Sequence, residues 1–263
     1  MFQRDPTPPA LVNPQLDGSP FYWPSGPVGV LLIHGFTATT VEVRDLAKSL
    51  LEAGYTVSGP LLPGHYTQPT DLNRVRWRDW VETVERSYAH LAQECPTVVV
   101  GGESTGGLLA LYLASRHPEA AAVLTYAPAL RLQISPWDRL RIRLLAPFIP
   151  YVPKPGSDQD TRWQGYPVNP LKGVLQLLRL QGEVRQALTA IRQPVLVVQG
   201  RLDRSVHPGV PEEILSSVNS QVCELHWMAH SRHVVLLDDE LDQVTQITLS
   251  FLHRLLSPAD RGL

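Results

Sequence analysis

Short apolar runs alternate with longer amphipathic segments through most of the 263-residue chain. Strands are predicted at VGVLLIH from Val28, YTVSGPLL from Tyr55, TVVVGG from Thr97, AAAVLTYA from Ala120, PVLVVQG from Pro194 and VCELHWM from Val222. The last of these alternates polar with apolar residues, which is typical of a strand near the edge of a sheet. Strands separated by helical segments predict an α/β fold with a mostly parallel sheet and helices on both faces.

The segments between these runs carry apolar residues at helical spacing. The stripes are Val43, Leu46, Leu50 and Ala53; Trp77, Trp80, Val84, Tyr88 and Leu91; the segment GGLLALYLASR; and Val244, Ile247, Phe251 and Leu255. Gly54 follows the first stripe, where a glycine commonly ends a helix. These stripes predict the helices that cover the sheet.

The regular alternation divides the chain into three parts. Residues 1–20 are rich in proline and polar residues and predict an N-terminal arm that lies on the surface or is disordered. Residues 21–127 and 185–263 form the predicted core. The alternation of apolar runs with amphipathic segments stops over residues 128–184. This segment holds seven prolines between Pro136 and Pro170. A long insertion of this kind in a compact fold predicts a cap or lid over a site.

The motif Gly102, Glu103, Ser104, Thr105, Gly106 matches G-x-S-x-G and lies where a predicted strand turns into a predicted helix. This context is that of a nucleophile elbow, in which a strained turn presents the serine hydroxyl above the carboxyl edge of the sheet. The two glycines allow strand and helix to approach closely. The alternative is a glycine-rich phosphate turn with an incidental serine. The strand, turn and helix together favour Ser104 as a nucleophile.

A serine nucleophile needs a base, and the base needs an orienting carboxylate. Asp203 follows the predicted strand at Val195 and is the candidate acid; its alternatives are to cap the next helix or to pair with Arg201 or Arg204. The loop MAHSRHVVLLDDE contains His230 and His233, and periodicity does not choose between them. His226 precedes them and is interpreted as a satisfied residue of the sheet.

Acyl transfer also requires two donors for an oxyanion. One candidate is the backbone N–H of Thr105, directly after the serine. The other is the N–H of Phe36 in the loop after the first long strand, where Gly35 lets the backbone approach the substrate. His34 in the same loop is a further candidate base, but its place at a strand end before the serine favours a bracing role.

Composition and charge exclude several functions. A formal net charge of -2 gives no reason to expect nucleic acid or an anionic membrane as a partner. The N-terminus lacks a secretory pattern and no apolar run has the length of an integral membrane segment, so a cytoplasmic protein is expected. Cys95 and Cys223 lack metal-type spacing and are interpreted as reduced core thiols. The sequence leaves the oligomeric state open.

Several motifs in order resemble one known family. HGFTATT, AGYTVSGPLLPGH, RDWVETVERSY, GGESTGG, GYPVNPLKGVLQLLRL and SRHVVLLD are similar to motifs of the bacterial carboxylesterase and monoacylglycerol lipase group of the α/β-hydrolase superfamily, over about residues 28–256. The resemblance implies an α/β-hydrolase fold, with Ser104 as nucleophile and Asp203 as acid. It also implies Phe36 and Thr105 as oxyanion donors and His233 as base, because HVVLLD reproduces the group's pattern after the base.

Two positions depart from the family pattern. Tyr66 stands where the group often has the second glycine of Gly-His-Gly, and Thr105 stands where it often has methionine or leucine. Both changes alter the wall of the expected pocket. The chemistry of the elbow is unaffected, because Thr105 contributes through its backbone N–H.

The expected function is hydrolysis of a small-molecule ester through an acyl-enzyme, with no metal or cofactor. The expected substrates carry uncharged short- to medium-chain acyl groups, monoacylglycerols among them. The candidate pocket residues are His34, Gly35, Glu103, Tyr66, Trp137, Ile142 and Leu145. The apolar insertion could instead only pack on the body, and Arg139, Arg141 and Arg143 could meet a carboxylate if they turn inward.

Two other functions remain open at this point. An acyltransferase or thioesterase would use the same three residues and differ only in the group that accepts the acyl chain. A noncatalytic binding module would keep the fold and lose the chemistry, but all three members of the expected triad are present in this sequence.

Overall fold

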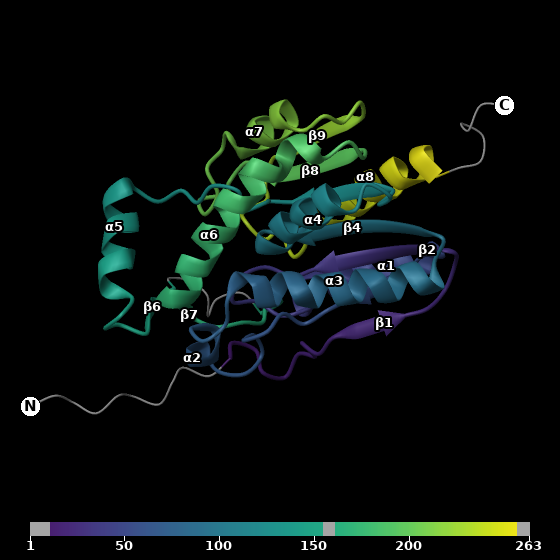
Figure 1. Cartoon of the computed structure of the whole chain (residues 1–263). Coiled ribbons are helices and arrows are strands. Elements are labelled where there is room, and N and C mark those ends of the chain that lie inside the picture. The colour runs from purple at the N-terminus through teal and green to yellow at the C-terminus, as the bar shows by residue number, and fades with distance from the viewer. Residues whose placement is uncertain (1–10, 155–160, 257–263) are drawn as a thin grey trace, which may run out of the picture.

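The fold is described from a computed structural model that defines residues 11–154 and 161–256. Its centre is a seven-stranded sheet in the order β1-β3-β2-β4-β5-β8-β9 (Figure 1). The strands are β1 Phe21–Trp23, β2 Val28–Ile33, β3 Thr56–Gly59, β4 Thr97–Glu103, β5 Ala122–Tyr126, β8 Val195–Gly200 and β9 Cys223–Met228. Only the β1–β3 pair among them is antiparallel. The predicted mostly parallel sheet is confirmed, and β9 lies at its edge as expected.

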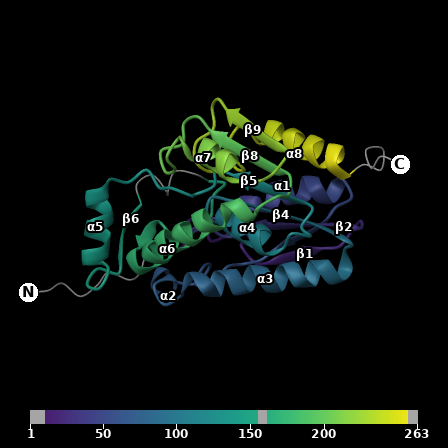
Figure 2. The same cartoon turned by 45° about the horizontal axis from the view of Figure 1, so that its top comes forward.

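Helices cover both faces of this sheet (Figures 1 and 2). The helices of the core are α1 Val41–Glu52, α3 Trp77–Glu94, α4 Thr105–Arg116, α7 Val210–Ser217 and α8 Leu241–Leu256. Alternate residues of a strand point to opposite faces, so Val30 and Leu32 pack with α1 and α8 while Leu31 and Ile33 pack with α3 and α4. Each strand of this kind is apolar on both sides, as a doubly covered parallel sheet requires.

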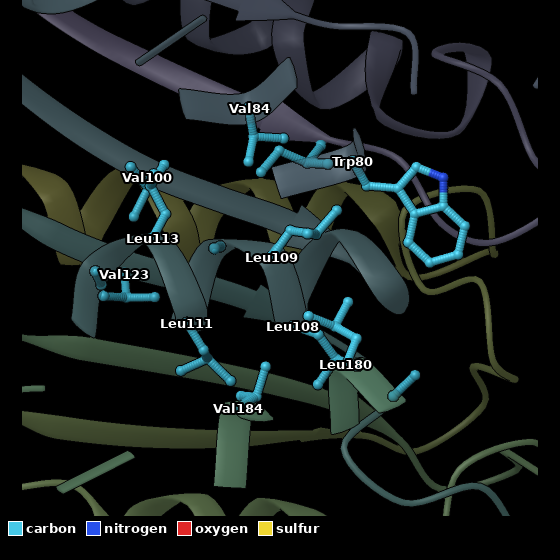
Figure 3. Close-up of a cluster of buried hydrophobic side chains, with 14 of the residues drawn as sticks. Trp80, Val84, Val100, Leu108, Leu109, Leu111, Leu113, Val123, Leu180 and Val184 are labelled. Atoms are coloured by element: carbon cyan, nitrogen blue, oxygen red, sulfur yellow. The ribbon is translucent and has the colours of Figure 1, made fainter. Parts of the chain in front are cut away.

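Helix α4 lies at the centre of one layer and carries Ser104 at its N-terminal end. Figure 3 shows Leu108 and Leu111 of α4 beside Leu180 and Val184, two buried residues of the helix α6 (Leu171–Ala187). Full burial of a leucine stabilises a fold by about 1.5–3 kcal/mol relative to leaving it exposed. The tightly packed α4 therefore gives the serine a fixed position.

The predicted insertion, residues 128–184, has more regular structure than its prolines suggest. It contains α5 Pro136–Leu145, the antiparallel strands β6 Tyr151–Pro153 and β7 Val168–Pro170, and most of α6. The expectation of irregularity is wrong for α6, whose apolar residues Leu171, Val174 and Leu177 repeat at helical spacing. Residue 184, the expected boundary, lies inside this helix. Helix α5 stands away from the rest of the molecule (Figures 1 and 2), and none of its residues is buried.

Other short elements were not predicted. β1, the single-turn α2 Pro69–Leu72 and the 3₁₀ turn Leu188–Ala190 have three or four residues each, too few for a periodic signal. The described part of the expected arm, residues 11–20, contacts the insertion: Val12 donates its N–H to the carbonyl of Gly165 at 2.9 Å. The rest of that arm, residues 1–10, lies outside the described residues.

The two cysteines differ in their surroundings. Cys95 is buried and packs in the core, as predicted. Cys223 is exposed, so its interpretation as a core thiol is wrong. The reason is its position as the first residue of the edge strand β9, where one side of the sheet has no neighbouring strand.

Candidate active site

The turn between β4 and α4 holds Ser104 in a strained backbone conformation, with φ 55° and ψ −111°. Glycine is needed on both sides of the serine. A Cβ atom on Gly102 would lie 2.5 Å from the carbonyl oxygen of Ile33, and a Cβ on Gly106 would overlap that same oxygen. The two glycines therefore let β2, β4 and α4 meet closely enough to form the turn.

His233 connects the serine to a carboxylate. Its Nε2 lies 2.9 Å from Ser104 Oγ, and its Nδ1 lies 2.9 Å from Asp203 Oδ2. Because an ionised carboxylate only accepts hydrogen bonds, the imidazole proton belongs on Nδ1 and leaves Nε2 free to take the hydroxyl proton. The serine and the carboxylate are buried, and the imidazole side chain is 23% exposed.

Asp203 is held on both of its oxygens. Oδ1 accepts the N–H groups of Ser205 at 2.7 Å and Val206 at 3.1 Å, and Oδ2 also accepts the side-chain amide of Gln199 at 2.7 Å. Burial alone would raise the pKa of Asp203, but the charge and hydrogen bond of His233 and the two backbone donors lower it overall. Its ion pair is with His233 rather than with Arg201 or Arg204.

The three neighbouring histidines occupy different places. His230 is exposed, and its backbone N–H donates to the Glu240 carboxylate at 2.8 Å. His226 lies in β9 and pairs with Glu224 at 3.2 Å. Of these three side chains, His233 is the one that contacts Ser104. The geometry thus separates the two histidines that periodicity could not distinguish.

Two backbone N–H groups beside the serine make no hydrogen bond within the part of the chain that the structure describes. They belong to Phe36 and Thr105, the residues expected to bind an oxyanion. Gly35 lies so close to the serine that a Cβ there would be 3.2 Å from Ser104 Cβ. The loop after β2 therefore approaches the nucleophile as the sequence predicts.

His34 braces this loop. Its Nε2 accepts the N–H of Leu62 at 3.1 Å, and its Nδ1 donates to the carbonyl of Gly35 at 2.9 Å. Burial lowers the pKa of His34 to about 4, although the hydrogen bond to Gly35 acts in the opposite direction. A neutral imidazole with both nitrogens bonded is not available as a base.

A cavity of about 720 Å³ opens above the serine. Ser104, His233, Gly35 and Phe36 form part of its wall, and α5 contributes Ile142 and Leu145. β6 and α6 contribute further apolar residues: Val152, Leu171, Val174 and Leu177. Polar residues are present as well: Thr37, Glu42, Lys154, Asn169, Arg141 and Arg204.

Four of the expected pocket residues do not line this cavity. His34 faces Leu62, and Tyr66 is half-buried in the loop after β3 with φ 60°. Trp137 lies on α5 with 73% of its surface exposed. Glu103 is fully buried and accepts the N–H groups of two residues of the histidine loop, Val235 and Leu236, at 3.1 Å each.

The arginines of α5 do not act together. Arg141 lines the cavity and pairs with Asp138 at 3.4 Å. Arg139 and Arg143 are not part of the cavity wall. The alternative that α5 arginines bind a substrate carboxylate in the cavity therefore depends on Arg141. Its charge already pairs with Asp138 of the same helix.

Sequence reasoning missed three residues beside this site: Glu42, Lys154 and Trp163. Glu42 accepts the N–H of Gly35 at 2.5 Å and the indole N–H of Trp163 at 3.3 Å. Lys154 lies over the Trp163 ring, 4.2 Å from its centroid, and burial lowers the pKa of Lys154 to about 8 against the opposing effect of Glu42. The signal available for Glu42 was an acidic residue beside the apolar stripe of a helix, which ordinarily indicates a solvated helix start.

The described residues hold neither a membrane-spanning helix nor a cluster of metal ligands. None of their helices is both long enough and apolar enough to cross a membrane. Over residues 11–154 and 161–256 no three histidine, cysteine or acidic side chains group as they would around a metal ion.

The chain is similar to known proteins over nearly its whole length. It is 35% identical to the thermostable monoacylglycerol lipase of Bacillus sp. strain H-257 over 90% of this chain and 96% of that protein. It is 30% identical to a carboxylesterase of Bacillus subtilis strain 168, with the same shares covered. A solved structure from work on LipS and LipT, two metagenome-derived lipolytic enzymes, superposes with a TM-score of 0.84 at 30% identity, covering 90% of this chain and 98% of that one.

A wider structural likeness shows the fold alone. The structure of Paleococcus ferrophilus monoacylglycerol lipase matches with a TM-score of 0.75 at 16% identity, covering 90% of this chain and 98% of that chain.

The family model described as serine aminopeptidase, S33, matches residues 28–240. This span includes the elbow, both loops beside it and the residues that contact Ser104. The chain therefore belongs to the serine aminopeptidase S33 family of α/β-hydrolases.

Proposed function

We propose that this protein, a hydrolase of the carboxylesterase and lipase class, cleaves esters with uncharged short- to medium-chain acyl groups, monoacylglycerols among them. The observation that carries the proposal is His233, which lies 2.9 Å from both Ser104 Oγ and Asp203 Oδ2 at the base of a largely apolar cavity. The similarity to the Bacillus monoacylglycerol lipase supports the choice of substrate.

The reaction runs in two steps. His233 Nε2 takes the hydroxyl proton as Ser104 Oγ attacks the ester carbonyl, and Asp203 stabilises the imidazolium that forms. The N–H groups of Phe36 and Thr105 donate to the oxyanion. The imidazolium returns the proton to the leaving alcohol, and the acyl group stays on the serine. Water then enters and gives a proton to the same imidazole as its oxygen attacks the acyl carbonyl, and the imidazolium returns a proton to Ser104 Oγ as the acid leaves.

Segment 128–184 acts in this proposal as a cap that encloses the acyl chain. Support comes from the side chains that α5, β6 and α6 contribute to the cavity, such as Ile142, Val152 and Val174. Each buried methylene gains about 0.8 kcal/mol, which corresponds to about a fourfold rise in kcat/KM per methylene. The rise is expected to stop when the acyl chain fills the cavity.

The test of the nucleophile uses Ser104→Ala. Ser87→Ala is the matched control, because it removes a serine hydroxyl from another helix, α3. Ser104→Ala is expected to lose ester turnover and labelling by a fluorophosphonate probe while it unfolds at the same temperature as the wild type. Labelling of folded Ser104→Ala would refute the assignment. Wild-type protein that labels but releases no acid would favour acyl transfer, and folded wild type without labelling would favour a binding module.

The test of the substrate compares p-nitrophenyl esters of increasing chain length with monoacylglycerols and with an acyl chain that ends in a carboxylate. We expect kcat/KM to rise with length to a maximum and the charged ester to be poor. A flat response, or preference for the charged ester, would refute the apolar pocket and leave the triad in place.

A further inference from the structure

Glu42 is a buried carboxylate that the mechanism above does not use. It lies in the first turn of α1, with only 4% of its surface exposed, and it forms part of the cavity wall near Ser104. Burying a carboxylate is costly unless hydrogen bonds and opposite charge compensate. Its two oxygens accept the N–H of Gly35 and the indole N–H of Trp163. The first of these donors belongs to the loop that carries the candidate oxyanion donor.

The hydrogen bond from the Gly35 N–H to Glu42 fixes the peptide unit just before the one that carries the Phe36 N–H. The N–H of Phe36 belongs to the peptide that follows Gly35, so a rotation of either unit redirects that donor. A Cβ on Gly35 would lie 2.8 Å from Glu42 Oε2 and 3.2 Å from Ser104 Cβ. Carboxylate, glycine and nucleophile are thus in close contact, and the loop has little room to shift between them.

The carboxylate also interacts with the charged groups around it. Burial raises the pKa of Glu42 overall, although the Gly35 N–H, the charges of His233 and Lys154, and the Trp163 N–H act to lower it. The pKa of Glu103 is raised well above its usual value by burial and by the negative charge of Glu42. Two N–H donors and nearby positive charge therefore compensate for the burial of this carboxylate.

We propose that Glu42 is a positioning residue for acyl transfer: its carboxylate holds the Gly35 peptide so that the Phe36 N–H points at the oxyanion. This inference rests on the proposed function for the role of Phe36. The hold on Gly35 is a separate physical claim that can be measured without turnover. The Trp163 indole N–H and the charge of Lys154 also act on this carboxylate.

Three variants test the proposal. Glu42→Ala removes both acceptor oxygens, whereas Glu42→Gln keeps one oxygen for Gly35 and loses the charge and the acceptor for the Trp163 indole N–H. Glu52→Gln is the matched control, because it makes the same change at the exposed end of the same helix. All rates are divided by the concentration of active sites, counted by titration of the nucleophile, so that a misfolded fraction does not contribute.

We expect Glu42→Ala to lose about 10- to 100-fold in kcat with KM within about twofold, because a misdirected oxyanion donor weakens only the transition state. Glu42→Gln is expected to lose less than about tenfold in kcat, because its amide oxygen can still accept the Gly35 N–H. Glu52→Gln should match the wild type in kcat and in KM.

Amide hydrogen exchange of Gly35 supplies a readout besides activity. The Gly35 amide should exchange slowly in the wild type and in Glu42→Gln, and faster in Glu42→Ala. Unchanged exchange in Glu42→Ala, or a loss of activity carried by KM, would overturn the proposal. If the wild type cleaves no ester, the proposed function fails, and the exchange measurement still decides whether Glu42 holds the loop.

Discussion

Replacing Asp203 with asparagine tests the triad most sharply, because the surrounding donors decide where the new NH2 group goes. The Oδ1 position accepts two backbone N–H groups, from Ser205 and Val206. An NH2 group there would face two donors, so the amide oxygen must take this position. The nitrogen then occupies the Oδ2 position, which lies 2.9 Å from His233 Nδ1.

This placement changes the imidazole tautomer. Facing an NH2 donor, Nδ1 must accept a hydrogen bond, so the ring proton moves to Nε2 and blocks transfer from Ser104 Oγ. The corresponding change in a serine protease lowers kcat about 10⁴-fold, or about 5.5 kcal/mol in activation free energy. We expect a loss of similar size for Asp203→Asn.

The same substitution should cost little stability. Gln199 donates its amide to Asp203 Oδ2 at 2.7 Å, and its own Oε1 is buried without a partner among the described residues. Turning the Gln199 amide over would point Oε1 at the new NH2 group and form a hydrogen bond in place of the lost one. We expect the free energy of unfolding to fall by no more than about 1.5 kcal/mol, the net value of one ordinary hydrogen bond.

The assay measures kcat on an activated ester per active site, together with denaturant unfolding, for wild type, Asp203→Asn and the control Asp239→Asn. Asp239 is a suitable control because its side chain is 85% exposed. A folded Asp203→Asn protein that keeps more than about a hundredth of wild-type kcat would refute the tautomer argument, since the expected loss is about 10⁴-fold. A loss of activity that follows unfolding would refute the predicted role of Gln199.

Three other predictions use simpler comparisons. His233→Ala should lose activity by about three orders of magnitude or more while His230→Ala loses little, and the reverse order on one activated ester would transfer the role of base to His230. Gly106→Ala should fail to give folded, labelled protein, because its Cβ would overlap a carbonyl of β2; normal probe labelling would contradict this. A thiol reagent should modify Cys223 in the native protein and Cys95 only after unfolding, and two fast native thiols would contradict the burial of Cys95.

The parts of the fold that the sequence predicts are those whose pattern is local. The sequence has four continuous apolar runs at the positions where the structure forms β2, β4, β5 and β8. The elbow is visible because its glycines lie within two residues of Ser104. β1 was missed because three residues carry no period, and its strand character comes from pairing with β3.

Local sequence pattern could not decide whether His230 or His233 is the candidate base. His230 and His233 lie three residues apart in one loop, and nothing in their spacing indicates which one faces the nucleophile. The loop is oriented by contacts that are distant in sequence: Glu103 accepts the N–H groups of Val235 and Leu236 across more than 130 residues. Sequence reasoning placed Glu103 in the substrate pocket, because the sequence gives its position beside Ser104 but not the direction in which its side chain points.

Three acidic residues around the nucleophile share one arrangement, in which a carboxylate accepts backbone N–H groups from a loop. Glu42 accepts from the loop of Phe36, Glu103 from the loop that follows His233, and Asp203 from the turn that follows it. A backbone donor has no side-chain identity, so no residue pattern marks the partner of such an acid. The nucleophile can therefore be found from a five-residue motif, while the groups that hold its surroundings in place become visible only when the chain is folded.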